Sequence, residues 1–214
     1  TFSMYTDEAF YGFGGNFTEL DKRGRKFEIW QRDALSTNSE HSYKGQPFFI
    51  SSRGFAIFLN TYTRSHFDMG MSSQLSWQMA SEDGTMDYLF FVAVSDNPYK
   101  ELVRRYTAYF GQIPSVPEWA FGYWQSKCSY QTQEEVEQVV REAKANGILL
   151  DLIHIDNWQE IPNQGLWIWD KERFSNPQAM IRFLHERNVR LSLWIFPYVS
   201  ERSPYFEHFA AKKY

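Results

Sequence analysis

The sequence predicts two fold classes along one chain, all-β structure over residues 1 to about 95 and alternating strands and helices from about residue 118. The first part holds short runs of aromatic and β-branched residues between turn residues, with no helical period between them. In the second part, apolar runs alternate with segments of helical period. The 214 residues are 43% hydrophobic and 22% charged, which is enough apolar mass for one or two cores.

The strands of the first part are marked by the apolar runs 48–50, 55–59 and 88–94. Turn signals at Ser52-Arg53-Gly54 and Glu82-Asp83-Gly84 separate these runs. Strands this close together, with no helix between them, indicate an antiparallel β-sandwich.

A helix and a linker join the two parts. Asn97-Pro98 combines a capping residue with Pro in the first helical turn, and apolar residues follow at helical spacing. Gly and Pro residues in the segment 111–117 end this helix. We therefore expect a sandwich domain over 1–96, a connecting helix and linker over 97–117, and an α/β domain over 118–214.

The second part is expected to form strands at 121–126, 148–155 and 190–196. Helices should begin at the capping box Thr132-x-x-Glu135 and at Asn176-Pro177. Right-handed crossovers make such a β-α-β-α-β series part of a doubly wound sheet or of a barrel. Three strands cannot close a barrel, so the sheet is either small and open or part of a larger domain.

Composition argues against several classes of partner. A net charge of -4 leaves no broad basic surface for nucleic acid. The longest apolar stretch, 148–155, is far shorter than the roughly 20 residues of a membrane-spanning helix. We expect no secretory signal in Thr1 to Phe10, and the compartment stays open. The single cysteine, Cys128, allows neither an internal disulfide nor a cysteine-based metal cluster.

Functional residues of a parallel α/β domain gather where its strands end. Asp156 follows the second strand, where a carboxylate needs polar partners, either sugar hydroxyls or the N–H groups of the next loop. His154 lies on the same strand face, but a His-x-Asp metal pair lacks a third ligand nearby, so no metal is expected. Trp194 ends the third strand, where it either supports a sugar ring or fills the sheet interior.

Other catalytic patterns are missing from the sequence. The Gly-rich run from Tyr11 to Asn16 lies in the all-β part and lacks the dinucleotide spacing and the following helix. The sequence has neither a phosphate-binding Gly-Lys-Ser/Thr loop nor a Gly-x-Ser-x-Gly nucleophile elbow.

Several short motifs, in this order, resemble glycoside hydrolase family 31, which contains α-glucosidases, α-xylosidases and relatives. The resemblance runs from about Tyr11 to Tyr214. Its pieces are Tyr11-Gly12-Phe13-Gly14-Gly15-Asn16-Phe17, Lys22-Arg23-Gly24, Trp30-Gln31-Arg32-Asp33, Pro47-Phe48-Phe49-Ile50-Ser51-Ser52-Arg53-Gly54, Pro117-Glu118-Trp119-Ala120-Phe121-Gly122, Gln125-Ser126-Lys127 and Tyr130.

This resemblance implies the C-terminal part of an N-terminal β-sandwich followed by the first three βα units of a (β/α)8 TIM barrel. It also implies a retaining mechanism, with a nucleophilic carboxylate and an acid/base carboxylate about 5 Å apart and no metal or cofactor. In the family the nucleophilic Asp follows the fourth barrel strand and the acid/base comes later, so both are expected beyond Tyr214. We therefore assign no catalytic residue to this segment and expect it to be inactive alone.

The resemblance also implies roles in substrate binding. Asp156 matches the family Asp that accepts hydrogen bonds from hydroxyls of the sugar in the reacting subsite. Arg32 and Asp33 match a sandwich-loop pair that reaches toward the next sugar or the aglycone. A surface salt bridge is the alternative for these two residues.

Aromatic residues complete the expected binding set. Trp158 and Trp194 match positions that line the pocket in the α-xylosidase-like branch, and Tyr130 closes the first-strand motif. Many family α-glucosidases have Arg and an aromatic residue where this chain has Lys127 and Cys128, so the pocket there differs.

The resemblance thus implies an exo-acting retaining α-glycosidase that cleaves terminal α-linked xylose or glucose from oligosaccharides or other α-glycosides, with α-xylosidase favoured. The alternatives are an α-glucosidase, a transglycosylase or glucan lyase of the same family, and a non-catalytic carbohydrate-binding relative. The sequence leaves the oligomeric state open.

Overall fold

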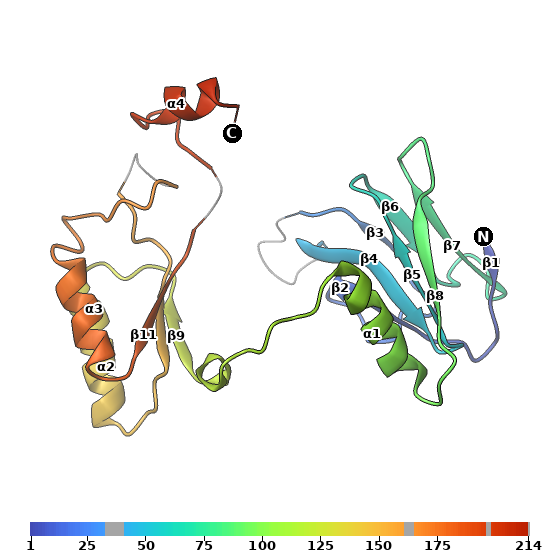
Figure 1. Ribbon diagram of the computed structural model, residues 1–214, viewed down its shortest axis with the longest axis horizontal. Coiled ribbons are helices and arrows are strands. Elements are labelled where there is room, and N and C mark those ends of the chain that lie inside the picture. The colour runs from blue at the N-terminus through green and yellow to red at the C-terminus, as the bar shows by residue number, and fades with distance from the viewer. Residues whose placement is uncertain (33–40, 161–164, 196–197, 214) are drawn as a thin grey trace. The chain divides into compact units, whose positions relative to one another are not determined.

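The computed structural model describes residues 1–32, 41–160, 165–195 and 198–213, and the chain forms two compact units, Thr1–Pro114 and Ser115–Tyr214 (Figure 1). Within these ranges, no helix has the length and apolar character needed to cross a membrane.

Two four-stranded antiparallel sheets make up most of the first unit, as the sequence predicts. One has the order β1-β7-β6-β3, and the other has the order β2-β4-β5-β8. The strands are β1 (Phe2–Ser3), β2 (Phe10–Gly15), β3 (Lys26–Ile29), β4 (Lys44–Ser51), β5 (Phe55–Leu59), β6 (Ser65–Asp68), β7 (Ser76–Ser81) and β8 (Tyr88–Val92).

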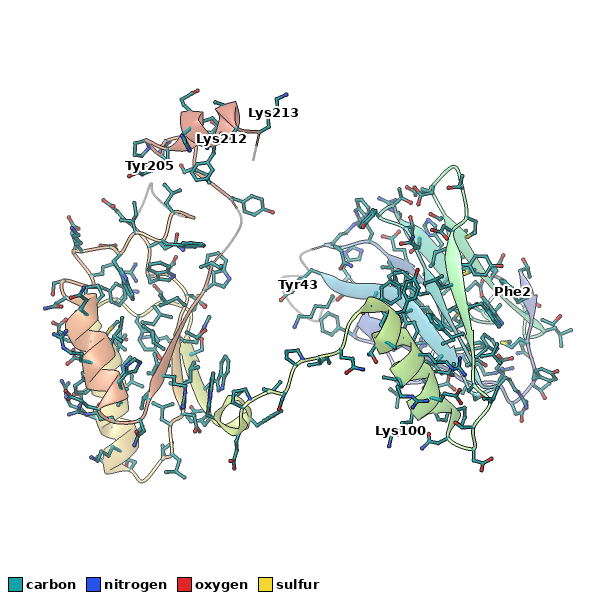
Figure 2. All side chains as sticks on the ribbon, viewed as in Figure 1. Phe2, Tyr43, Lys100, Tyr205, Lys212 and Lys213 are labelled. Carbon is teal, nitrogen blue, oxygen red and sulfur yellow. The ribbon has the colours of Figure 1, made fainter. Side chains whose placement is uncertain are left out.

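Aromatic rings from both sheets form the core of this sandwich. Phe49 on β4 is fully buried at its centre, and its ring lies 5.0 to 6.5 Å from five others, those of Phe10, Phe13, Phe55, Phe67 and Trp77. At one edge, Phe2, which is labelled in Figure 2, stacks on Trp77 with the ring centroids 4.1 Å apart. Many of the aromatic residues of this unit therefore serve packing.

The Gly-rich run in β2 has a structural role. The pairing of β2 with β4 shifts register between Gly12 and Gly14, which marks a β-bulge. Gly14 has a φ of 75°, and a Cβ there would meet the carbonyl oxygen of Lys44. A side chain at this position would push the two strands apart.

The helix α1 (Pro98–Phe110) packs against β5 and β8, on the second sheet (Figure 1). The Asn97 side chain accepts a hydrogen bond from the Lys100 N–H at 3.2 Å, which confirms the predicted cap. Leu102 is buried in a small cluster with Ile50 and Ala56. The helix thereby covers apolar side chains of β4 and β5.

A buried carboxylate ties the start of α1 to the end of β8. Glu101 accepts hydrogen bonds from the N–H groups of Val94 and Ser95 at 2.9 and 2.8 Å, and from Nε of Arg105 at 2.8 Å. The Ser95 hydroxyl, the Arg105 guanidinium and these N–H groups stabilise the charged form and lower the pKa of Glu101 to about 2.

We expect this carboxylate to make the sandwich sensitive to acid. Its folded pKa lies below the ordinary value of 4.5, so its stabilising effect is complete above pH 4.5 and is lost as the pH falls to about 2. A Glu101→Gln variant of the full-length protein should be less stable than wild type at neutral pH, and the difference should shrink over that pH range. Thermal unfolding at a series of pH values measures it, and a constant difference would contradict the assignment.

Three parallel strands in the order β11-β10-β9 form the sheet of the second unit, as the β-α-β-α-β prediction requires. They are β9 (Trp124–Lys127), β10 (Leu152–Ile155) and β11 (Arg190–Leu193). The helices α2 (Gln133–Ala145) and α3 (Pro177–His185) lie together on one side of this sheet (Figure 1). A 3-10 turn, η1 (Glu118–Phe121), precedes β9, and α4 (Phe206–Ala211) follows β11.

The three strands are shorter than the apolar runs suggest. Phe121, expected in the first strand, ends η1, where the N–H of Gly122 donates to the carbonyl of Trp119. Ile148 and Leu149, expected in the second strand, are exposed. The first pair between β10 and β9 is Leu152 with Trp124. Residues 148–151 have no partner in β9, so they do not extend the strand.

Only one of the two hydrogen bonds of the predicted capping box forms at α2. The Thr132 hydroxyl accepts from the Glu135 N–H at 3.2 Å, but the Glu135 carboxylate accepts from the N–H of Gln131 at 2.6 Å and pairs with Lys127. The cap of α3 forms as predicted, with Asn176 accepting from the Ala179 N–H at 3.0 Å.

Candidate substrate-binding site

Asp156 lies directly after β10, at the end of the sheet where ligands bind in parallel α/β domains. Its side chain is 36% exposed, and its Oδ1 lies 2.8 Å from Nε2 of His154. Among the described residues, no backbone N–H donates to this carboxylate, so the loop-capping alternative finds no support there. The carboxylate is held on one side and remains open to solvent.

A row of polar side chains leads from β11 to Asp156. His154 and Ser192 are directly paired across β10 and β11, and Nδ1 of His154 lies 3.0 Å from the Ser192 hydroxyl. The imidazole therefore has a partner at each nitrogen. Within the described ranges, no group of three or more His, Cys, Asp or Glu side chains is arranged to hold a metal ion.

The two predicted site tryptophans take different positions. Trp194 continues the pairing beyond β11, because its N–H donates to the Ile155 carbonyl at 3.0 Å, and its side chain is 43% exposed. Trp158 is only 3% exposed, and its indole Nε1 donates to the Trp194 carbonyl at 2.7 Å. Its ring also packs on that of Trp169, with the centroids 4.8 Å apart. Trp158 thus joins the end of β10 to the end of β11.

Tyr130 is completely buried in the core of the second unit, in the same cluster as Trp158 and Phe174. Burial raises the pKa of its hydroxyl, and the nearby Gln125 side chain acts in the opposite direction. The Nζ of Lys127 lies 5.9 Å from the centre of its ring. Cys128, between these two residues, is exposed.

The predicted sandwich-loop pair is described only in part. Arg32 belongs to the first unit, where its Nη2 lies 3.6 Å from Oε1 of Glu28. This ion pair fits the surface salt-bridge alternative, and substrate contact by Arg32 stays a prediction. Asp33 lies outside the described residues.

The sequence does not reveal the hydrogen-bond partners of the predicted site residues. The i, i+2 spacing of His154 and Asp156 is visible as a shared strand face, but only the structure shows that the two side chains bond to each other. No sequence signal indicates that Trp158 donates to the Trp194 backbone.

Two family models cover most of the chain. The glycosyl hydrolase 31 N-terminal galactose mutarotase-like domain matches residues 1–68, and the glycosyl hydrolases family 31 TIM-barrel domain matches residues 113–214.

Curated relatives include α-xylosidase XylQ of Lactiplantibacillus pentosus, which is 33% identical over 99% of this chain and 28% of its own length. α-Glucosidase 2 of Bacillus thermoamyloliquefaciens is 30% identical over 93% of this chain and 26% of its own length. The chain thus spans under a third of the length of these relatives.

Solved structures agree with this relationship. A GH31 dextranase from Flavobacterium johnsoniae, complexed with glucose, has a TM-score of 0.90 and 26% identity over 99% of this chain and 26% of its own. A GH31 α-xylosidase from a soil metagenome, complexed with xylose, has a TM-score of 0.83 and 29% identity over 99% of this chain and 29% of its own. From its two family models and these relatives, the chain belongs to glycoside hydrolase family 31.

Proposed function

We propose that the protein containing this chain is a retaining, exo-acting α-glycoside hydrolase that releases terminal α-linked xylose or glucose, with α-xylosidase as the favoured activity. The observation that carries the proposal is the partly open carboxylate of Asp156 at the end of β10, in a family 31 chain. Relatives named α-xylosidase and α-glucosidase support xylose and glucose as the released sugars.

This chain would contribute binding rather than bond cleavage. Retaining hydrolysis needs one carboxylate that attacks the anomeric carbon and one carboxylic acid that protonates the leaving oxygen. From the family resemblance, we expect both carboxylates to follow Tyr214 in the whole protein. Asp156 would accept hydrogen bonds from sugar hydroxyls, and these bonds speed the reaction only as far as they strengthen in the transition state.

The aromatic residues would shape the same subsite. The exposed ring of Trp194 offers an apolar face to the C–H groups of a sugar. Trp158 would keep that ring in place through its bond to the Trp194 carbonyl, and Tyr130 lies in the same buried cluster as Trp158. Direct sugar contact by Trp158, Tyr130, Arg32 and Asp33 remains a further prediction for the whole protein.

Sugar release by the full-length protein tests the proposal, with aryl α-xyloside and aryl α-glucoside compared at equal concentration. Preferential xylose release supports α-xylosidase activity, whereas preferential glucose release supports an α-glucosidase. Release of neither sugar, together with sugar binding, would favour a non-catalytic carbohydrate-binding relative. A new glycosidic bond or an unsaturated sugar product would identify a transglycosylase or a lyase.

A further inference from the structure

We propose that His154 is a positioning residue that fixes the carboxylate of Asp156 in the orientation that meets the substrate. The inference rests on the proposed sugar-binding role of Asp156 and adds a residue that acts through it. The hydrogen-bonded row Ser192, His154, Asp156 carries the argument.

Strand geometry brings the three side chains together. His154 and Asp156 are two positions apart, so their side chains leave the same face of the chain. Ser192 lies directly opposite His154 in the parallel pairing of β10 with β11. The imidazole therefore stands between a hydroxyl on one strand and a carboxylate at the end of the next.

The hydrogen bonds define the orientation of the imidazole. Nε2 of His154 lies 2.8 Å from Oδ1 of Asp156, and a carboxylate only accepts, so Nε2 carries the proton of this bond. Nδ1 lies 3.0 Å from the Ser192 hydroxyl, which can donate to it. With both nitrogens engaged, the ring is held against rotation, and it presents a fixed donor to Asp156.

A fixed donor has a consequence for binding. Without the bond from His154, the Asp156 side chain, which is 36% exposed and has no other hydrogen-bond partner among the described residues, would sample several rotamers. Binding a sugar would then cost the entropy of fixing one of them. The charge-assisted bond from His154 occupies Oδ1 and leaves the second oxygen, which has two lone pairs, oriented for sugar hydroxyls. The site is thereby preorganised before the sugar arrives.

Two substitutions of His154 distinguish the loss of its hydrogen bond to Asp156 from the loss of its ring. The amide nitrogen of Gln lies where Nε2 of His lies, so His154→Gln keeps the bond to Asp156. The shorter Asn places its amide nitrogen at the Nδ1 position, near Ser192, and cannot reach the carboxylate. The substrate is the aryl α-glycoside, xyloside or glucoside, that the full-length protein hydrolyses. We expect kcat/KM for it to fall about 10- to 100-fold in His154→Asn and at most about threefold in His154→Gln.

A double-mutant cycle shows whether His154 acts through Asp156. In an Asp156→Ala background, His154→Asn should change the remaining kcat/KM by less than about twofold, because no carboxylate is left to orient. Thermal unfolding midpoints of the two His154 variants should agree, so that their difference in activity reflects positioning. If His154→Asn unfolds, Ser192→Ala supplies the second measurement, and it should lower kcat/KM without changing the fold.

The outcomes separate this inference from the proposed function. Equal kcat/KM in His154→Asn and His154→Gln, or equal losses from His154→Asn with and without Asp156, would overturn the positioning role while leaving the sugar-binding role of Asp156 intact. If Asp156→Ala alone keeps wild-type kcat/KM, the proposed site itself is wrong, and the inference falls with it.

Discussion

Replacing Asp156 by Ala in the full-length protein is expected to lower kcat/KM for its aryl α-glycoside by about 100- to 10,000-fold. A hydrogen bond to a charged acceptor contributes about 1.5 to 3 kcal/mol, and two sugar hydroxyls on one carboxylate make two such bonds. Every 1.4 kcal/mol corresponds to a tenfold change, which gives this range. Initial rates at substrate concentrations well below KM measure it.

Loss of folding would not explain such a result. The Asp156 side chain is partly exposed and lies outside the apolar cluster of the second unit, so its removal leaves no cavity there. The thermal unfolding midpoint should therefore stay close to that of wild type. Glu172, an exposed carboxylate in the same unit, provides the matched control, and Glu172→Ala should keep wild-type activity.

Asp156→Asn refines the experiment, because the amide keeps the size of the side chain and removes its charge. Its activity should lie between those of wild type and Asp156→Ala, since neutral hydrogen bonds are weaker than charged ones. Wild-type kcat/KM in Asp156→Ala would refute the assignment of this residue to the sugar site.

The order of strands and helices could be predicted because its signals are local. Asn97 and Asn176 each precede Pro, and both cap their helices with the predicted side-chain bond. Strand ends could not be predicted in the same way, because they depend on the partner strand. Ile148 and Leu149 are as apolar as Leu152, yet β9 begins only opposite Leu152.

In the candidate site, too, features with local sequence signals could be predicted, and features that depend on other segments could not. Asp156 and Trp194 could be placed at strand ends from the alternation of strands and helices, and the structure puts both there. The burial of Trp158 could not be foreseen, because it depends on the ring of Trp169 and on the carbonyl of Trp194, which reach it from other segments. The contact of His154 with Ser192 on β11 could not be predicted for the same reason.

The second large effect concerns the stability of the sandwich. We expect Phe49→Ala to destabilise the first unit by about 3 to 5 kcal/mol, the usual cost of truncating a buried Phe in a core that cannot fully collapse. Phe49 is completely buried, and its five ring neighbours come from both sheets, so the cavity would lie where the sheets meet. Each lost ring pair adds to the cost of the lost apolar contact.

Native-state hydrogen exchange of the β4 and β5 amides in the full-length protein measures this loss, because it reports the opening of these strands without requiring two-state unfolding of the whole chain. The free energy of opening should fall by the same 3 to 5 kcal/mol. Tyr62 in the same unit is fully exposed, so Tyr62→Ala is the control and should change it by less than about 0.5 kcal/mol. Similar values for the two variants would show that the stability of the sandwich does not depend on the aromatic cluster around Phe49, and its stabilisation would then have to come mainly from the strand pairing and from the packing of α1.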